Sequence, residues 1–143
     1  MRAVSGWLMT LHGMFKINEL GLGNFEKYML QPAGLPLTGV LSWLVPSTEL
    51  VFGAMLIVGL LTRVAAAFLC LEMLGTGFII KIHFHLGILG PKGSGGAEVD
   101  FLMLAGLLIP LMLGPGAWSI DALLRLDRPW TRVPRATQEA VHA

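Results

Sequence analysis

The sequence contains unusually little charge. Charged residues make up 13% of its 143 residues, whereas hydrophobic residues make up 55%. About a quarter of the residues in an ordinary soluble domain are charged. The composition therefore excludes a typical soluble domain and predicts a small integral membrane protein.

Cysteine and clustered basic residues are scarce as well. Cys70 is the single cysteine, so neither an internal disulfide nor a Cys-x-x-Cys redox pair can form. The ten Lys and Arg residues are scattered and the net charge is +1, which makes nucleic acid an unexpected partner. The sequence has no haem-ligand pair, flavin fingerprint or iron–sulfur cysteine set. Any electrons would therefore have to enter from another subunit.

The apolar segments predict an all-α protein, an integral membrane four-helix bundle. The expected spans run from Arg2 to about Ile17, from about Leu37 to Leu61, from Arg63 to about His83, and from about Gly96 to Leu113. Glycine and proline between these segments stop helices. Inside the spans, Pro46 and Pro110 are tolerated where neighbours satisfy the freed carbonyl groups.

The connections between the spans have their own signals. Asn24 to Leu30 can form a short interfacial helix, Thr62-Arg63 forms a tight polar turn, and Gly114-Pro115-Gly116 ends the last span. These breaks predict a four-helix domain over residues 1–120 and a polar, arginine-rich tail over residues 121–143.

Basic residues indicate how the spans are oriented. With four spans, both termini and the Thr62-Arg63 turn lie on one side, which then holds all six arginines, while the four lysines lie on or toward the other. The positive-inside rule makes the arginine side cytoplasmic. A cleaved signal peptide is not expected, because His12 and Lys16 interrupt the apolar stretch it would need. We therefore expect a multi-pass protein of a prokaryotic inner membrane.

Acidic residues interrupt or border these apolar segments. An unpaired charge near the middle of a spanning helix costs about 2.5 to 3.5 kcal/mol, so such groups must be paired, protonated or hydrated. At a helical rise of ~1.5 Å per residue, two polar layers are expected. The acids and their expected neighbours are Glu49, Glu72, Glu98, Asp100, His12 and Lys16.

Helical spacing suggests specific pairs among these residues. His12, Lys16 and Glu19 share one stripe at i, i+4 and i+7. If that stripe faces the bundle, Lys16 can neutralise Glu49 or Asp100. His12 can then hydrogen-bond Glu72. The first four candidate site residues, His12, Lys16, Glu49 and Glu72, would form a buried proton relay; Arg63, Glu98 and Asp100 are candidate binding residues.

A structural interpretation stays open beside this one. Buried ion pairs between spanning helices often serve only to fix packing and register. Glu98 and Asp100 also lie at a helix N-terminus, where the macrodipole favours acids. The pair His83 and His85 could ligate a metal or haem only if the helix has already ended between them. No metal site is therefore expected.

The ordered combination of short motifs resembles the DoxX family of small four-helix membrane proteins, over about residues 2 to 121. The motifs are Arg2 with His12-Gly13 and Lys16, Glu49-Leu50-Val51-Phe52-Gly53, Gly59 to Ala66, Gly95-Gly96-Ala97-Glu98, and Gly114-Pro115-Gly116 with Ser119 and Asp121. Phe52 departs from the pattern, since relatives commonly show glycine there. Glu49, Arg63, Glu98 and the Gly114-Pro115-Gly116 turn match recurring family positions.

The resemblance implies a link to quinone-dependent redox systems. The leading hypothesis is a small membrane subunit of such a complex, not catalytic alone, that docks partner subunits in a hetero-oligomer and helps to form a quinone and proton site. The alternative is a structural accessory subunit of a respiratory or photosynthetic assembly, without chemistry of its own. A small-solute or ion carrier is disfavoured because the sequence contains no internal repeat.

Overall fold

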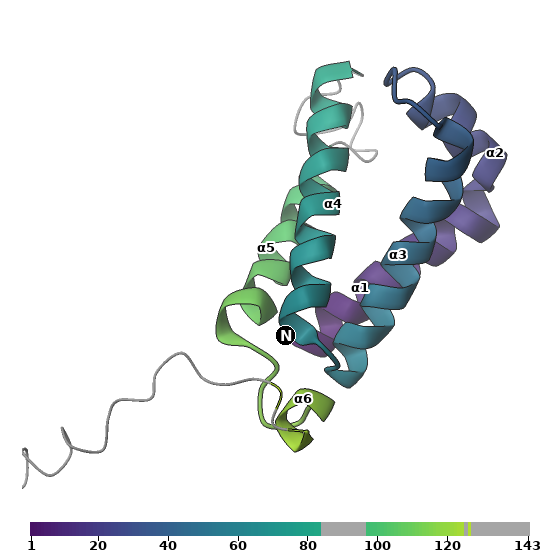
Figure 1. Cartoon of the computed structure of the whole chain (residues 1–143). Coiled ribbons are helices and arrows are strands. Elements are labelled where there is room, and N and C mark those ends of the chain that lie inside the picture. Colours follow the sequence, from purple (N-terminus) through teal and green to yellow (C-terminus); the bar gives the residue numbers. More distant parts are fainter. Residues whose placement is uncertain (84–96, 125, 127–143) are drawn as a thin grey trace, which may run out of the picture.

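The computed structural model describes residues 1–83, 97–124 and 126, with the backbone alone for residues 80–83. Within these ranges every regular element is helical, which confirms the all-α class. The elements are α1 (Arg2–Phe15), η1 (Lys16–Leu20), α2 (Leu22–Phe25), η2 (Glu26–Leu30), α3 (Thr38–Val58), α4 (Thr62–His83), α5 (Glu98–Leu113) and α6 (Ile120–Leu123). Here η1 and η2 are π-helical turns. Figure 1 shows these elements along the chain.

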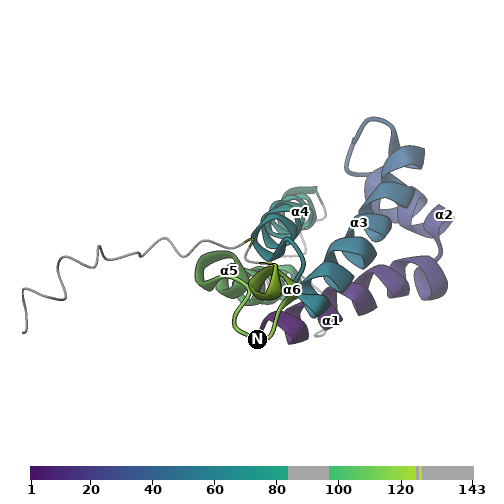
Figure 2. The same ribbon diagram turned by 60° about the horizontal axis from the view of Figure 1, so that its bottom comes forward.

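The long helices associate as two pairs. In Figures 1 and 2, α1 lies along α3 and α4 lies along α5. The two pairs meet toward the end of the molecule that holds the N-terminus, the α3–α4 turn and α6. At the other end α3 and α4 diverge.

Glycine allows the backbones of α1 and α3 to approach each other closely. A Cβ atom added at Gly6 would lie 2.6 Å from the carbonyl oxygen of Gly53, and one added at Gly13 would lie 2.8 Å from that of Pro46. Small residues at such crossings permit tight helix contact where lipid supplies no hydrophobic drive. This pair is therefore held at a fixed spacing along most of α1.

The hydrophobic core lies where the two pairs meet. Its largest fully buried members are Met9 of α1, Leu56 of α3, Leu69 and Met73 of α4, and Leu107 of α5. Met55 and Met103 pack against this cluster as well, so at least four of the eight methionines serve in packing, as an unbranched and flexible side chain allows. Cys70 is also buried against this cluster.

The first helix changes its winding at Lys16, and this overturns part of the expected stripe. From Lys16 to Leu20 the chain is π-helical, and a π turn takes more residues than an α turn. Lys16 is 6% exposed, whereas Glu19 is exposed. The expectation that Glu19 shares the buried face was wrong, because the wider turn rotates it away.

The turn between α3 and α4 begins earlier than the sequence indicated. Helix α3 ends at Val58, and Gly59 adopts a left-handed conformation with φ 76°. The N–H groups of Gly59 and Leu60 both donate to the carbonyl of Met55, an arrangement typical of glycine-terminated helices. Residues 59–61 therefore form the turn, and Thr62-Arg63, expected to form it, instead begin α4.

The short helix expected between the first two spans is present. It consists of α2 and η2, which together cover residues 22–30. Phe25 is buried, and Thr38 at the start of α3 donates a 2.8 Å hydrogen bond to Glu26 of η2. This segment is thereby tied to α3.

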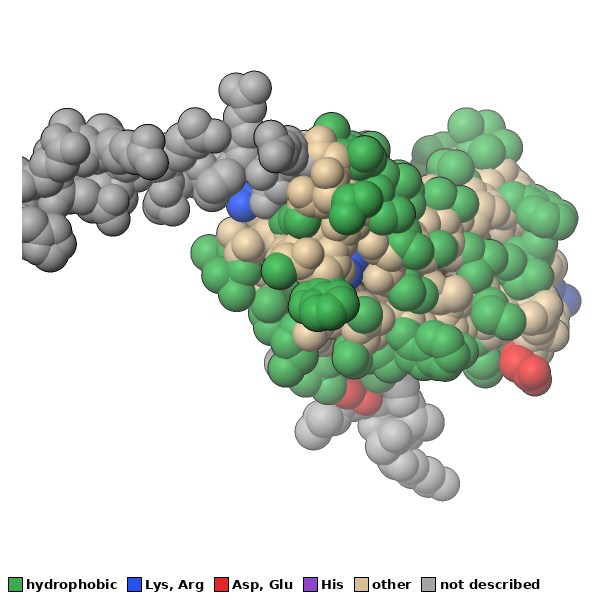
Figure 3. Space-filling view, turned by 90° about the horizontal axis from the view of Figure 1, so that it is seen from below, with side chains coloured by type: hydrophobic (Ala, Val, Ile, Leu, Met, Phe, Trp, Pro, Cys, Tyr) green, Lys and Arg blue, Asp and Glu red, His purple; other side chains and the backbone are tan. Residues whose placement is uncertain are grey.

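Two of the described helices are long and apolar enough to cross a membrane. They are Thr38–Val58, with mean hydropathy 1.7, and Thr62–Ile79, with mean hydropathy 1.4. Figure 3, which looks onto the end of the molecule that holds α6, shows hydrophobic side chains mixed with polar side chains and backbone, and few charged side chains. Large apolar side chains such as Phe78, Leu102 and Met112 are two-thirds exposed or more. Such a surface suits lipid rather than water.

Candidate functional site

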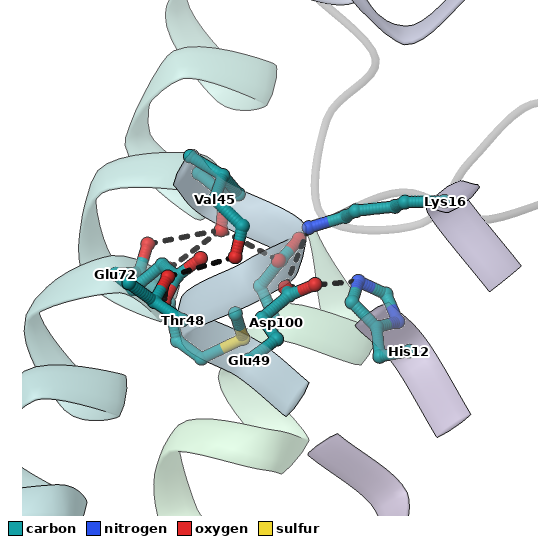
Figure 4. Close-up of polar contacts among 9 residues, drawn as sticks. His12, Lys16, Val45, Thr48, Glu49, Glu72 and Asp100 are labelled. Atoms are coloured by element: carbon teal, nitrogen blue, oxygen red, sulfur yellow. Dashed lines mark hydrogen bonds and ion pairs between the residues drawn. The ribbon is translucent and has the colours of Figure 1, made fainter. Parts of the chain in front are cut away.

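A buried ion pair joins the end of the first helix to the second long helix. Lys16 Nζ donates to Glu49 Oε1 at 2.5 Å, and the two side chains are 7% and 0% exposed. Figure 4 shows Lys16 and Glu49 pointing toward one another. Of the two acids expected to neutralise Lys16, the structure therefore pairs it with Glu49.

The close contact of α1 and α3 places this pair. Gly13 lies one turn before Lys16, and a Cβ there would lie 3.1 Å from the Cβ of Glu49. Without a side chain at Gly13, the two backbones approach closely enough for Lys16 to reach Glu49. The Lys16 Nζ also lies 5.2 Å from the ring centroid of Phe25 in α2, which adds a cation–π contact.

His12 lies against the same carboxylate. Its Nε2 is 3.9 Å from Glu49 Oε1, and its side chain is 27% exposed. The expected hydrogen bond between His12 and Glu72 does not form in the described structure, because α1 packs on α3 and presents His12 to Glu49 instead. His12, Lys16 and Glu49 therefore form one group, and Glu72 approaches it from α4.

Glu72 is half-buried and is held by a threonine of α3. The Thr48 hydroxyl lies 3.1 Å from Glu72 Oε2 and 2.8 Å from the carbonyl oxygen of Val45, one helical turn earlier. Figure 4 shows these contacts beside Glu49. A threonine hydroxyl thus bridges a carboxyl group and a helix carbonyl.

Asp100 repeats this arrangement between α4 and α5. The Thr76 hydroxyl lies 2.8 Å from Asp100 Oδ1, and it also lies 3.1 Å from the carbonyl oxygen of Glu72. Asp100 is 5% exposed. Figure 4 shows Asp100 among the side chains around Glu49 and Glu72. We call His12, Lys16, Thr48, Glu49, Glu72, Thr76 and Asp100 the polar cluster.

The polar cluster leaves carboxyl oxygens unpaired. Glu49 Oε2 and Glu72 Oε1 are both buried, and neither has a hydrogen-bond partner among the residues described. Buried polar atoms usually find a partner, so each exception calls for an explanation. The cluster also holds three carboxyl groups against one lysine. It is therefore neither fully bonded nor balanced in charge when all three acids are ionised.

The other two candidate residues lie at the starts of α5 and α4. Glu98 is the first residue of α5 and is half-buried, with Oε2 buried and lacking a hydrogen-bond partner in the described part of the chain. Arg63 is the second residue of α4, about 13 Å along the helix axis from Glu72 at ~1.5 Å per residue. Arg63 therefore lies at the N-terminal end of α4, whereas Glu72 lies near its middle.

A second polar region, missed as a site by the sequence reasoning, ties the helix ends together there. Arg2 donates hydrogen bonds to the carbonyl oxygens of Leu56, at 2.7 Å, and of Trp118, at 2.6 Å. The Asp121 carboxylate accepts from the N–H groups of Leu61, at 2.7 Å, and Thr62, at 2.8 Å. We call this region the helix-end junction; its side chains are those of Arg2, Ser119 and Asp121.

The helix-end junction also changes where the polar tail begins. Asp121 is 3% exposed and lies in α6, and its own N–H donates to the carbonyl of Gly59. The boundary expected between residues 120 and 121 thus falls inside an element that is bonded to α4. The tail beyond residue 126 and its arginines lie outside the described residues.

Thr48 and Thr76 were also absent from the sequence-based site. One usable signal was spacing, because Thr76 follows Glu72 by four residues and shares its helix face. In the part of the chain that the structure describes, no group of three or more His, Cys, Asp or Glu side chains is arranged to hold a metal ion. The His85 of the proposed histidine pair lies outside that part.

Comparison with known proteins gives a consistent result. The family model DoxX matches residues 1–82. The chain is 35% identical over 133 residues to an uncharacterized membrane protein of Mycobacterium tuberculosis, an alignment that covers 87% of this chain and 78% of the relative. No solved structure matches it.

Proposed function

Because this chain belongs to the DoxX family of membrane proteins, we propose that it is a membrane subunit of a quinone-linked redox complex and that its polar cluster exchanges protons. In this proposal a partner subunit supplies the electrons. Reduction of a quinone takes up two electrons and two protons to give the quinol. Carboxyl groups positioned in a low-dielectric site can deliver those protons.

The observation that carries the proposal is the charge imbalance of the polar cluster. Lys16 neutralises Glu49, with which it forms a 2.5 Å contact. Glu72 and Asp100 have no cation of their own among the described contacts. A buried carboxylate without a partner is costly in a membrane, so it is protonated or hydrated. Two exchangeable protons are thereby expected beside a fixed ion pair.

The two threonines support this reading, because each can serve either protonation state. A hydroxyl has one proton to donate, whereas a backbone carbonyl can only accept. When Glu72 is ionised, Thr48 donates to it. When Glu72 is protonated, it donates to Thr48, which then donates to Val45. Thr76 can do the same for Asp100 and the Glu72 carbonyl.

Exposure suggests an order of proton transfer. Glu49 and Asp100 are 0% and 5% exposed, whereas Glu72 is half-buried and contacts Thr48 of α3. Glu72 is therefore the acid that a quinone or a partner subunit would reach first. In the proposal Glu72 gives one proton to the quinone as the partner's electrons reduce it and regains a proton from water. The Asp100 carboxyl, which is hydrogen-bonded to Thr76, supplies the second proton.

The proposed topology follows from the same features. We propose that α1 with η1, α3, α4 and α5 all cross a prokaryotic inner membrane. The N-terminus, the α3–α4 turn and α6 lie at one end of the molecule, and this end carries Arg2 and Arg63. The positive-inside rule then places it in the cytoplasm. The polar cluster would lie in the opposite half of the membrane.

A second candidate function is a purely structural accessory subunit. The observation that favours it is the position of the Lys16–Glu49 pair, which joins helices already packed through glycines. Such a pair can fix helix register without any chemistry. In that case Glu72 and Asp100 would serve only to hold neighbouring helices through Thr48 and Thr76.

The experiment uses Glu72→Gln and Asp100→Asn, which keep the shape of each side chain but cannot exchange a proton. Glu19→Gln is the matched control, because Glu19 is exposed and outside the polar cluster. Each tagged variant is expressed in its native host in place of the original chain. The co-purifying chains are identified, and reduction of decylubiquinone and menadione by the membranes is measured.

The proposal expects normal assembly for all three variants. It also expects quinone reduction to fall by about a hundredfold in Glu72→Gln, since general acid catalysis contributes 10²–10⁴-fold, with Glu19→Gln unchanged. Intact assembly with unchanged quinone reduction in both cluster variants would favour the structural subunit and reject proton exchange.

A further inference from the structure

A surface groove runs along the first two turns of α4. It has a volume of about 300 Å³ and is lined by Arg63, Val64, Ala67, Phe68 and Leu71. Arg63, Ala67 and Leu71 follow at intervals of four residues, so they form one line along the helix. A cationic side chain therefore stands at one end of an otherwise apolar groove.

The side chains explain why this surface is hollow. Ala67 forms a shallow floor between larger neighbours, and Phe68 and Leu71 are 54% and 67% exposed. The ring of Phe68 stacks on that of Phe52 in α3, with centroids 5.1 Å apart and planes 8° from parallel. Phe52, the residue that departs from the family pattern, thus holds one wall of the groove in place.

A smaller hollow adjoins the cationic end. It measures about 150 Å³ and shares Arg63 and Val64 with the groove, while Thr62 and Asp121 also line it. Both oxygens of Asp121 accept hydrogen bonds from backbone N–H groups, and the residue is 3% exposed. Asp121 therefore lines the same hollow as Arg63 while both of its oxygens bind the start of α4.

We propose that this groove binds an anionic phospholipid, with the phosphate at Arg63 and an acyl chain along Ala67, Phe68 and Leu71. Arg63 is the second residue of the candidate span Thr62–Ile79, which places it at the level of lipid headgroups. The apolar part of the groove continues from there toward the hydrocarbon. Basic pockets on the cytoplasmic side of membrane proteins are suited to anionic headgroups. The inference does not depend on the proposed redox function.

The test is native mass spectrometry of the full chain, released from detergent after titration with phosphatidylglycerol or phosphatidylcholine of identical acyl chains. Arg63→Gln removes the charge, and Ala67→Phe fills the groove. Lys27→Gln is the control for loss of an exposed cation, and Ala54→Phe is the control for adding a ring at an exposed alanine of α3. Circular dichroism checks that each variant remains helical.

The original chain is expected to retain phosphatidylglycerol about fivefold more tightly than phosphatidylcholine, the effect of one basic residue near an anionic surface. Arg63→Gln should abolish this preference, and Ala67→Phe should weaken both lipids. Both controls should behave as the original chain.

Equal retention of the two lipids by the original chain would overturn the proposal. So would unchanged phosphatidylglycerol binding in Arg63→Gln, which remains informative if Ala67→Phe fails to fold. Glycerol 3-phosphate is added as a competitor in the same titration. Displacement by this soluble phosphate at equal concentration would show that the acyl chain contributes nothing and reject the groove as a lipid site. A dimer that Ala67→Phe dissociates would assign the groove to a second copy of the chain.

Discussion

The polar cluster and the helix-end junction are both polar regions in an apolar protein, but they satisfy their polar atoms differently. In the junction, both oxygens of Asp121 accept backbone hydrogen bonds and Arg2 donates to two carbonyl groups. In the cluster, Glu49 Oε2 and Glu72 Oε1 are buried and lack a hydrogen-bond partner among the described residues. The carboxylate of the junction thus has both oxygens paired, whereas Glu49 and Glu72 of the cluster each have one oxygen without a partner among the described residues.

This difference suggests that the junction serves the stability of the fold and that the cluster serves proton exchange. A side chain whose hydrogen bonds all go to backbone groups would lose those bonds if its protonation changed, and the helix cap would be lost with them. Groups that share a proton with a threonine hydroxyl can change state at small cost. We therefore expect variants in the junction to affect stability alone, and conservative variants in the cluster to affect function more than stability.

The largest expected effect breaks the ion pair of the cluster. Lys16→Met leaves Glu49 buried beside an apolar side chain, and removing one partner of a buried pair costs about 3 to 5 kcal/mol. The double variant Lys16→Met with Glu49→Leu should recover most of this loss, because no charge is then left unpaired. The free energy of unfolding in detergent is measured by tryptophan fluorescence. A double variant as unstable as the single one would show that the pair does not act as a unit.

A smaller effect is expected from the junction. Asp121→Ala removes a charged acceptor from the N–H groups of Leu61 and Thr62, and hydrogen bonds to charged groups contribute about 1.5 to 3 kcal/mol. Ser119→Ala is the control, because its hydroxyl caps α6 through the N–H of Ala122 and donates to the carbonyl of Gly116, without bonding α4. Loss of such a cap costs about 1 kcal/mol. Thermal unfolding of the two variants distinguishes them. Equal losses would mean that the carboxylate adds nothing beyond an ordinary cap.

The smallest effect on stability, and the most specific one, is expected at the threonines. Thr48→Val and Thr76→Val each remove one interhelical hydrogen bond, for a loss of about 0.6 kcal/mol. Infrared difference spectra after a pH change report the carboxyl C=O stretch, with Glu72→Gln and Asp100→Asn assigning the bands. Thr48→Val should shift only the Glu72 band and Thr76→Val only the Asp100 band. Bands that do not respond to either variant would argue against the shared protons.

Sequence patterns gave the helices well but the contacts between them only in part. The four apolar segments correspond to α1 with η1, α3, α4 and α5, with ends shifted by a few residues. The sequence predicted either Glu49 or Asp100 as the partner of Lys16, and the structure pairs it with Glu49. The predicted partner of His12, Glu72, was wrong. Depth along a membrane can be counted from helical rise, whereas the direction a side chain faces depends on how each helix is rotated. At η1 the change in winding altered that rotation and exposed Glu19.

By itself the sequence determined the all-α class, the scarcity of charge that marks a membrane protein, and the acids that interrupt its apolar segments. Those properties are local, since composition and helical spacing depend only on neighbouring residues. Tertiary structure alone decided that Gly6, Gly13 and Gly53 bring α1 and α3 together, that Thr48 and Thr76 serve the carboxyl groups, and that Asp121 caps α4 from 59 residues away. Each of these is a contact between distant segments, and its geometry is fixed only when whole helices pack.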